Sequence, residues 1–182
     1  MTNRKGKKQL GFTLIELTVS IFILAVISSI AVANYRAGEK RRQVSLAVDG
    51  IVNSVRLAQT YALTGKQIES TSCASKAPKD YRVNFSSSSE YVLYSDDTCG
   101  NSFELQRFSL PAQTQMKAGE LRLNSASVNS LSIMFEPPFG RLTASTGGVF
   151  SSFTSASIGV EQKDGTVTKS ATVDGVSGRI GE

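Results

Sequence analysis

The chain contains no histidine and no tryptophan, and its 182 residues include only two cysteines. The common ligand sets of zinc and haem sites therefore cannot be assembled, and no histidine is present to serve as the base of a nucleophilic triad. The sequence also lacks a glycine-rich loop of the kind that cradles phosphate. We therefore expect no catalytic residue, no metal site and no cofactor, and we do not expect an enzyme.

Positive charge is only slightly in excess, and most of the excess lies at the N-terminus. The formal net charge is +5, and four of these charges fall within the first eleven residues: Arg4, Lys5, Lys7 and Lys8. The rest of the chain carries about +1 by the same count. So small a charge attracts phosphate groups weakly, so the high pI is poor evidence for a nucleic-acid partner.

A long apolar run follows residues 1–11, which we interpret as a basic leader. Residues 12–33 contain one ionisable side chain, Glu16. A helix of this length would span roughly 33 Å, enough for a hydrocarbon core of about 30 Å. Basic residues tend to stay on the cytoplasmic side, which would send the chain after Asn34 across the membrane. The pattern predicts a single-pass protein of the cytoplasmic membrane with an extracytoplasmic head.

Two simpler interpretations of this run explain only part of it. A secretory signal peptide would end at the small residues Ala31-Val32-Ala33, but its apolar core is normally about 7 to 15 residues long. An uncleaved membrane anchor explains the length. An anchor does not explain why Glu16 is present, because a carboxylate costs about 2 kcal/mol or more at the bilayer centre.

A third interpretation accounts for both the length and the carboxylate. The segment Gly11-Phe12-Thr13-Leu14-Ile15-Glu16, preceded by a short basic leader, resembles the type IV prepilin processing motif. The resemblance implies that a prepilin peptidase cuts between Gly11 and Phe12 and that the new amine of Phe12 is methylated. It also implies that Glu16 meets the terminal amine of a neighbouring subunit during assembly, because desolvated opposite charges attract strongly. The alternative is a Glu16 side chain that only reaches toward the membrane surface.

Residues 34–64 continue the helix as an amphipathic segment. Gly65 stands where a helix C-cap is expected, and no proline interrupts residues 12–63. Apolar residues recur at spacings of three and four, which indicates one buried helix face: Val44, Val48, Ile51, Val52, Val55, Ala58 and Ala62. The expected shape is the lollipop of pilins, with a transmembrane first half of the helix and a second half packed on a head.

Residues 65–182 show the short alternating patterns of strands. The pairs Asp164-Gly165 and Asp174-Gly175 predict tight turns, and residues 143–157 predict a long loop. The expected strands cover 81–85, 90–94, 103–108, 131–135, 158–162, 166–173 and 176–180. An antiparallel sheet must bury one face, and the apolar helix face can cover it, so we expect an α+β fold.

Within the pilin-like proteins, the head resembles the GspH/FimT group. The resemblance rests on the helix end at residues 56–63, on Phe139-Gly140-Arg141 and on Gly178-Arg179-Ile180. It implies a minor pilin or a type II secretion pseudopilin that ends in a pilus or pseudopilus. The implied partners are other subunits, the prepilin peptidase, an inner-membrane assembly platform and, before assembly, membrane lipid.

The two cysteines, Cys73 and Cys99, lie in the part of the chain that we expect to be exported. Exported domains form disulfides readily, so we expect these two residues to be paired. The alternative is two separate buried thiols.

DNA binding is a second candidate function, because some FimT-like minor pilins bind DNA through basic residues near the C-terminus. The candidates here are Lys163, Lys169 and Arg179. The group's Gly-Arg-x-Arg pattern is incomplete, since Gly181 occupies the place of the second arginine and Glu182 adds a negative charge. Because affinity for phosphates scales with the number of cations, a nucleic acid is not the expected partner.

Overall fold

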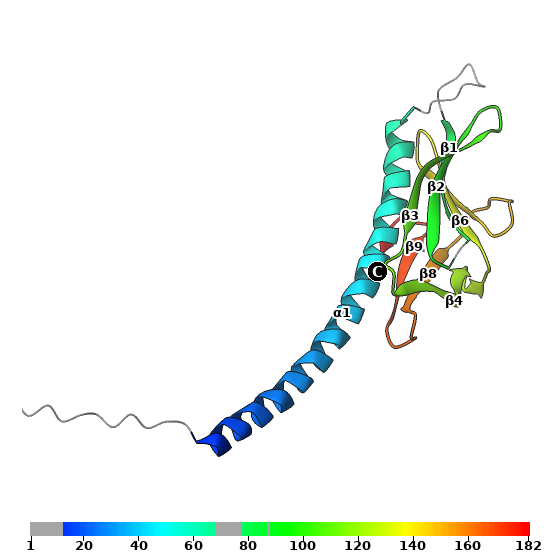
Figure 1. Cartoon of the computed structure of the whole chain (residues 1–182). Helices are drawn as coiled ribbons and strands as arrows, with labels where there is room; N and C mark the ends of the chain where they lie inside the picture. Colours follow the sequence, from blue (N-terminus) through cyan, green and yellow to red (C-terminus); the bar gives the residue numbers. More distant parts are fainter. Residues whose placement is uncertain (1–12, 68–77, 87) are drawn as a thin grey trace, which may run out of the picture. The chain divides into compact units, whose positions relative to one another are not determined.

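The structure is a computed structural model that describes residues 13–67, 78–86 and 88–182. The chain divides into two compact units, residues 1–39 and residues 40–182, and we call the second the head unit. Figure 1 shows one long helix followed by strands. The elements are α1 (Leu14–Thr64), β1 (Pro78–Phe85), β2 (Glu90–Asp97), β3 (Ser102–Ser109), β4 (Thr114–Leu123), β5 (Ala126–Ser127), β6 (Leu131–Glu136), β7 (Arg141–Ser145), β8 (Ser155–Gln162), β9 (Thr168–Asp174) and β10 (Ile180–Gly181).

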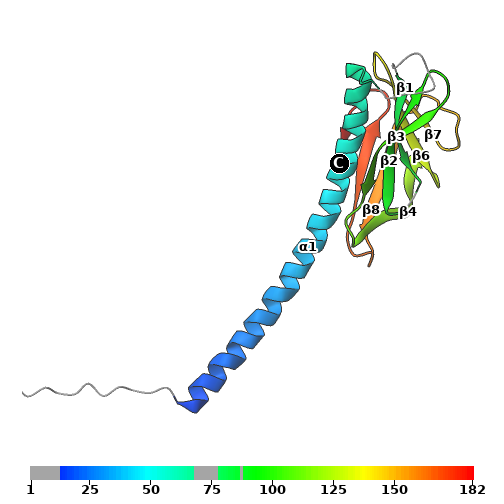
Figure 2. The ribbon, with the colours of Figure 1, turned by 45° about the horizontal axis from the view of Figure 1, so that its top comes forward.

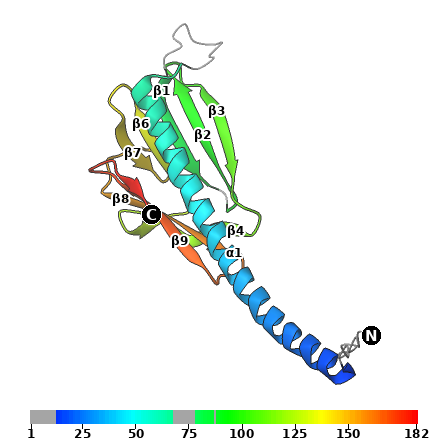
Figure 3. The same cartoon turned by 90° about the vertical axis from the view of Figure 1, so that its left-hand side faces the viewer.

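The strands form two antiparallel sheets of five strands each. Sheet A has the order β3-β2-β1-β6-β7, and sheet B has the order β10-β9-β8-β4-β5. Figures 2 and 3 show that the C-terminal part of α1, which belongs to the head unit, runs alongside the strands. The predicted α+β fold, a long apolar helix packed on antiparallel strands, is confirmed.

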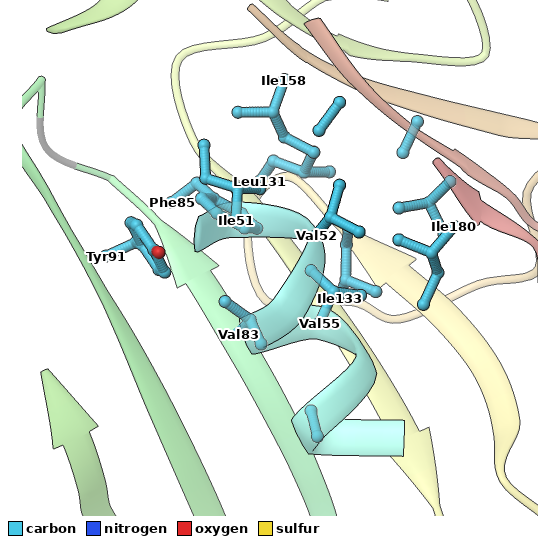
Figure 4. Packing of buried hydrophobic residues seen from close by; sticks show 14 of the residues in the cluster. Ile51, Val52, Val55, Val83, Phe85, Tyr91, Leu131, Ile133, Ile158 and Ile180 are labelled. Atoms are coloured by element: carbon cyan, nitrogen blue, oxygen red, sulfur yellow. The ribbon is translucent and has the colours of Figure 1, made fainter. Parts of the chain in front are cut away.

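One face of α1 forms the centre of the core. All seven apolar residues that the spacing predicts to be buried are buried, and none is more than 6% exposed. They pack in one cluster with Val83 of β1, Ile133 of β6 and Ile158 of β8 (Figure 4). Since β1 and β6 belong to sheet A and β8 to sheet B, a single helix face joins the two sheets. Valine and alanine predominate on this face, and their small side chains let the helix backbone approach the strands closely.

The end of the helix follows the predicted cap. Gly65 adopts a left-handed backbone conformation with a φ of 63°, which costs glycine little. The following amide, Lys66 N, donates a hydrogen bond of 3.2 Å to Tyr61 O and so satisfies a carbonyl of the last turn. The chain thereby leaves the helix in a defined direction before it enters β1.

The predicted loop at residues 143–157 is wrong at both ends. Strand β7 continues to Ser145 and β8 begins at Ser155. Ala144 of β7 and Ser151 of the following segment exchange two backbone hydrogen bonds of 3.0 Å. Phe153 is 5% exposed and belongs to the core, whereas Val149 is 84% exposed. The serine, threonine and glycine content of this segment conceals its strand pairing, because pairing uses backbone groups that every residue carries.

The last predicted strand is also wrong in extent. A turn covers residues 175–177, and only Ile180–Gly181 pair with β9 as β10. Asp174 directs this turn, because its Oδ1 accepts hydrogen bonds from Val176 N at 2.8 Å and Ser177 N at 2.9 Å. Similarly, β9 begins at Thr168 and not at residue 166.

Strand β4 escapes prediction because its sequence does not alternate. Its pairing with β8 is interrupted between Met116 and Leu121, where the backbone of Gly119 has a φ of 78°. Gly159 of β8 lies opposite this irregularity, and a Cβ there would stand 2.4 Å from Glu120 Cβ. A long strand with an internal irregularity shows no period of two, so pattern analysis passes over it.

The packing of α1 predicts a sharp contrast between two substitutions on this helix. Ile51 is fully buried, so Ile51→Ala should lower the free energy of unfolding by about 3 kcal/mol. Leu46 is 52% exposed, and Leu46→Ala should change it by less than about 0.5 kcal/mol. Denaturant unfolding of the purified protein in a neutral detergent, followed by circular dichroism, measures both. Equal losses would show that the predicted helix face is not the core.

Candidate functional site

The first half of α1 exposes an unbroken apolar surface. Its large apolar residues range from 45% exposed at Val26 to 81% exposed at Leu14. No charged residue occurs between Glu16 and Arg36, a distance of roughly 30 Å along a helix. An 18-residue window of α1 has a mean hydropathy of 2.4, so by length and composition the helix is long and apolar enough to cross a membrane. Soluble monomers rarely expose so much contiguous apolar surface. The apolar surface of this helix therefore needs lipid or other helices around it.

Three hydroxyl groups on this segment are satisfied within the helix. Thr18 Oγ1 donates to Ile15 O at 2.9 Å, and Ser20 Oγ donates to Glu16 O at 2.7 Å. Ser29 Oγ donates to Val26 O at 2.8 Å. Such bonds to the preceding turn lower the cost of placing a hydroxyl among hydrocarbon, because no donor is left without an acceptor. These three residues are therefore compatible with an apolar environment.

Thr13 caps the N-terminus of α1 and fixes the position of Glu16. Glu16 N donates to Thr13 Oγ1 at 3.3 Å, and Leu17 N donates to Thr13 O at 3.2 Å. Threonine followed three residues later by glutamate is the pattern of a helix capping box, a local signal that the sequence analysis missed. The exposed Glu16 carboxylate thus lies in the first helical turn, where the positive end of the helix dipole favours a negative charge.

The predicted processing site lies outside the described residues. Gly11 and Phe12 both fall there, so cleavage between them and methylation of Phe12 stay predictions. Cys73 also falls there, and its pairing with Cys99 stays a prediction. Cys99 lies in the turn after β2, which is organised by the fully buried Asp97: its Oδ1 accepts from Cys99 N at 2.9 Å and from Asn101 N at 2.8 Å.

The three candidate DNA-contacting cations of the alternative function lie on different elements. Lys163 is in the turn after β8, Lys169 is in β9, and Arg179 precedes β10. Lys169 Nζ lies 2.9 Å from Glu182 Oε2. This hydrogen bond holds the pKa of the Glu182 carboxyl below its ordinary value, so Lys169 has an ionised partner. An ion pair of this kind offers less net charge to a phosphate than a free lysine does.

The turn that contains Lys163 is tied to α1 by a neighbouring carboxylate. Lys40 Nζ lies 2.5 Å from Asp164 Oδ2, and both side chains are about 40% exposed. Thr166 donates to Asp164 Oδ1 through its hydroxyl at 2.6 Å and its amide at 3.0 Å. The hydrogen bond from Lys40, followed by those from Thr166, holds the pKa of Asp164 well below its usual range. The β8–β9 hairpin is therefore fastened to the helix beside Lys163.

Arg179 has a second arginine beside it that the sequence analysis did not assign to this site. Arg56 of α1 and Arg179 line the same shallow cleft of about 490 Å³, together with Gln59, Thr60, Gly178 and Ile180. Arg56 Nη2 donates to Ile180 O at 2.9 Å, which holds its guanidinium at the final strand. None of these lining residues is acidic. Only the tertiary structure brings the two arginines together, because 122 residues separate them.

Comparisons with known proteins give one family-model match and two related proteins. The family model described as "Prokaryotic N-terminal methylation motif" matches residues 6–32. Two curated relatives, each a "Fimbrial protein" of Pseudomonas aeruginosa, are 37% identical over 84 residues, which is 45% of this chain and 52% of each relative. The chain thus spans about half the length of the curated relatives it matches. No solved structure matches. The methylation motif at residues 6–32 and the long helix packed on antiparallel strands are the two findings on which a functional proposal can be based.

Proposed function

We propose that this protein is a structural subunit of a type IV pilus-like filament, either a minor pilin or a type II secretion pseudopilin of the GspH/FimT group. The observation that carries this proposal is the apolar first half of α1, which is exposed along its length and lies largely within the methylation motif matched at residues 6–32. A prepilin peptidase removes residues 1–11 and methylates Phe12. The subunit then waits in the inner membrane, with its head unit outside the cytoplasm, until an assembly platform adds it to a pilus or pseudopilus.

The exposed apolar surface is covered by two different partners in turn. Before assembly lipid covers it, and afterwards the helices of other subunits do. Lipid tails are about as apolar as leucine side chains, so the hydrophobic effect hardly favours the second state over the first. Close packing and polar contacts must then drive assembly and set the register.

Glu16 supplies such a polar contact. Cleavage after Gly11 would create an amine one residue before Thr13, at the end of the helix whose partial charge is positive. A cation is unfavourable there unless a carboxylate lies close to it. The Glu16 carboxylate of an adjacent subunit meets this need, and the pairing also removes the cost of an unpaired carboxylate in the membrane.

Cleavage is tested by the mass and N-terminal sequence of the protein from cells that contain a prepilin peptidase. The mature chain should begin at Phe12 and carry one methyl group on its amine. Gly11→Val should block cleavage, because a branched side chain obstructs the cut. Ala33→Leu should leave it intact. A mature chain that begins at Asn34 would mean a signal peptide and would contradict the filament proposal.

The role of Glu16 is tested by incorporation into filaments. Glu16→Gln keeps the size of the side chain and removes its charge, so processing should continue while incorporation falls at least about tenfold, equivalent to about 1.4 kcal/mol. Ser20→Ala, one turn along the helix, is the matched control and should assemble normally, because Ser20 Oγ bonds only within its own helix. Quantitative immunoblotting of sheared filaments gives both values. Normal incorporation of the glutamine variant would exclude the pairing.

DNA uptake is the alternative function, and the cleft between Arg56 and Arg179 is the observation that favours it. Two guanidinium groups without an acidic neighbour among the lining residues could contact adjacent phosphates. Against this, Lys169 is paired with Glu182, and Lys163 lies beside the Lys40–Asp164 pair. The local field is therefore mixed in sign, and we rank DNA binding second.

We predict weak DNA binding by the whole protein in a neutral detergent. With about three phosphate contacts, the slope of log affinity on log salt should be near −2.7, so any affinity at 50 mM salt should fall roughly fortyfold by 200 mM. Fluorescence anisotropy with a labelled duplex measures this, with Arg56→Ala and Arg179→Ala beside the parent protein. Micromolar binding at 150 mM salt that both substitutions abolish would move DNA uptake to first place.

A further inference from the structure

Two carboxylates face each other on the side of sheet A that is turned away from the core. Asp80 of β1 is the register partner of Asp96 of β2. Neighbouring residues of β1, Tyr81 and Val83, point into the core, and side chains alternate along a strand. Asp80 and Arg82 therefore share the opposite face with Asp96. Glu136, at the end of the adjoining β6, adds a third carboxylate nearby.

Asp80 is buried without a hydrogen-bond partner for its side chain. It is 2% exposed, and among the described residues its Oδ1 finds no donor; Asp96 Oδ1 is buried and lacks a donor as well. The nearby guanidinium does not resolve this, because Arg82 Nη1 lies 2.7 Å from Asp96 Oδ2 and Arg82 Nη2 lies 2.9 Å from Ser102 Oγ. Two buried carboxylate oxygens on register partners thus lack what a buried oxygen needs, a hydrogen to accept.

A proton is the smallest group that can satisfy both residues. If Asp80 is protonated, its O–H can donate to the Asp96 carboxylate, and only one negative charge remains to be offset by Arg82. Burial first, and then the charge of Asp96, raise the pKa of Asp80 to about 6; Glu136 adds a small increase, while Arg82 and Lys79 act in the opposite direction. Burial thus outweighs the two nearby cations.

We propose that Asp80 and Asp96 hold one proton between them in weakly acidic surroundings, and that its loss loosens this end of sheet A. The pair lies one residue from Asp97, which is fully buried and organises the turn that contains Cys99. Loosening should therefore extend from the β1–β2 register pair into residues 97–101. A filament subunit with this device would hold one end of its head unit tightly at acidic pH and less tightly at neutral pH.

The direction of the effect follows from the protons bound in each state. A folded-state pKa above the ordinary value of an aspartate means that the folded protein binds more protons than the unfolded chain between about pH 4 and 6. Stability is therefore greatest below pH 4 as far as this group is concerned, and it is lost as the pH rises through 6. Most carboxylates in ion pairs lose their contribution to stability as the pH falls. A loss of stability as the pH rises therefore distinguishes the Asp80–Asp96 pair from them.

Hydrogen exchange of the whole protein in a neutral detergent provides the test. After correction for intrinsic exchange rates, opening of the backbone around Asp80 and Asp96 should increase by up to about twentyfold between pH 4.5 and 7.5, because part of the roughly hundredfold change that a pKa shift of about two units gives falls below pH 4.5. Asp80→Asn should abolish the increase, because its amide cannot ionise. Asp49→Asn, at an exposed site on α1, is the matched control and should keep it.

A second variant covers the case in which Asp80→Asn does not fold. Glu136→Gln removes the weakest of the charges that raise the pKa of Asp80, so the increase in opening should persist with its midpoint moved slightly to lower pH. Opening that is independent of pH in the parent protein would overturn the proposal. So would slow exchange at pH 7.5 that appears only with millimolar calcium and is lost in Asp80→Asn, because a metal ion, not a proton, would then hold the pair.

Discussion

The head unit depends on the burial of one helix face between residues 44 and 62. Sheet A and sheet B are separate in hydrogen bonding, and the shared cluster around Ile51 is where both bury their apolar sides. Burial of a full aliphatic side chain contributes about 1.5 to 3 kcal/mol, so the fully buried residues of this face dominate the stability of the unit. The capped helix end at Gly65, the β1–β2 hairpin and the final contact of Arg56 with Ile180 all take their positions from it.

The first half of the same helix has an exposed apolar surface in place of a buried one. No break separates the halves, because α1 runs without interruption from Leu14 to Thr64. The change is one of composition: large apolar side chains surround the helix on all sides up to Val32, whereas apolar residues after Lys40 concentrate on one side. A helix that is apolar all round suits a membrane or a bundle of helices, and a helix that is apolar on one side suits a globular core. One continuous helix thus combines a segment suited to a membrane or helix bundle with a segment suited to a globular core.

The carboxylates of the molecule fall into two groups with different consequences. Asp97, Asp164 and Asp174 accept hydrogen bonds from backbone amides and shape the turns in which they lie. Asp80 has no such donor among the described residues, and Glu16 lies in the apolar half of α1. The first group is satisfied within the subunit. The second requires something further, which we propose to be a proton for Asp80 and the amine of a neighbouring subunit for Glu16.

The helix, its buried face, its C-cap and most of the strands can be predicted from the amino-acid sequence. These features have local periods or local signals: spacings of three and four at Val44 and Val48, a glycine at 65, and alternation in β1 and β2. The capping box of Thr13 and Glu16 was equally local and could have been found. Four features could be found only from the tertiary structure. They are the division into two sheets, the irregular strand β4, the shared cleft of Arg56 and Arg179, and the register pairing of Asp80 with Asp96. These depend on strand register and on contacts between distant residues, for which a single sequence carries no local signal.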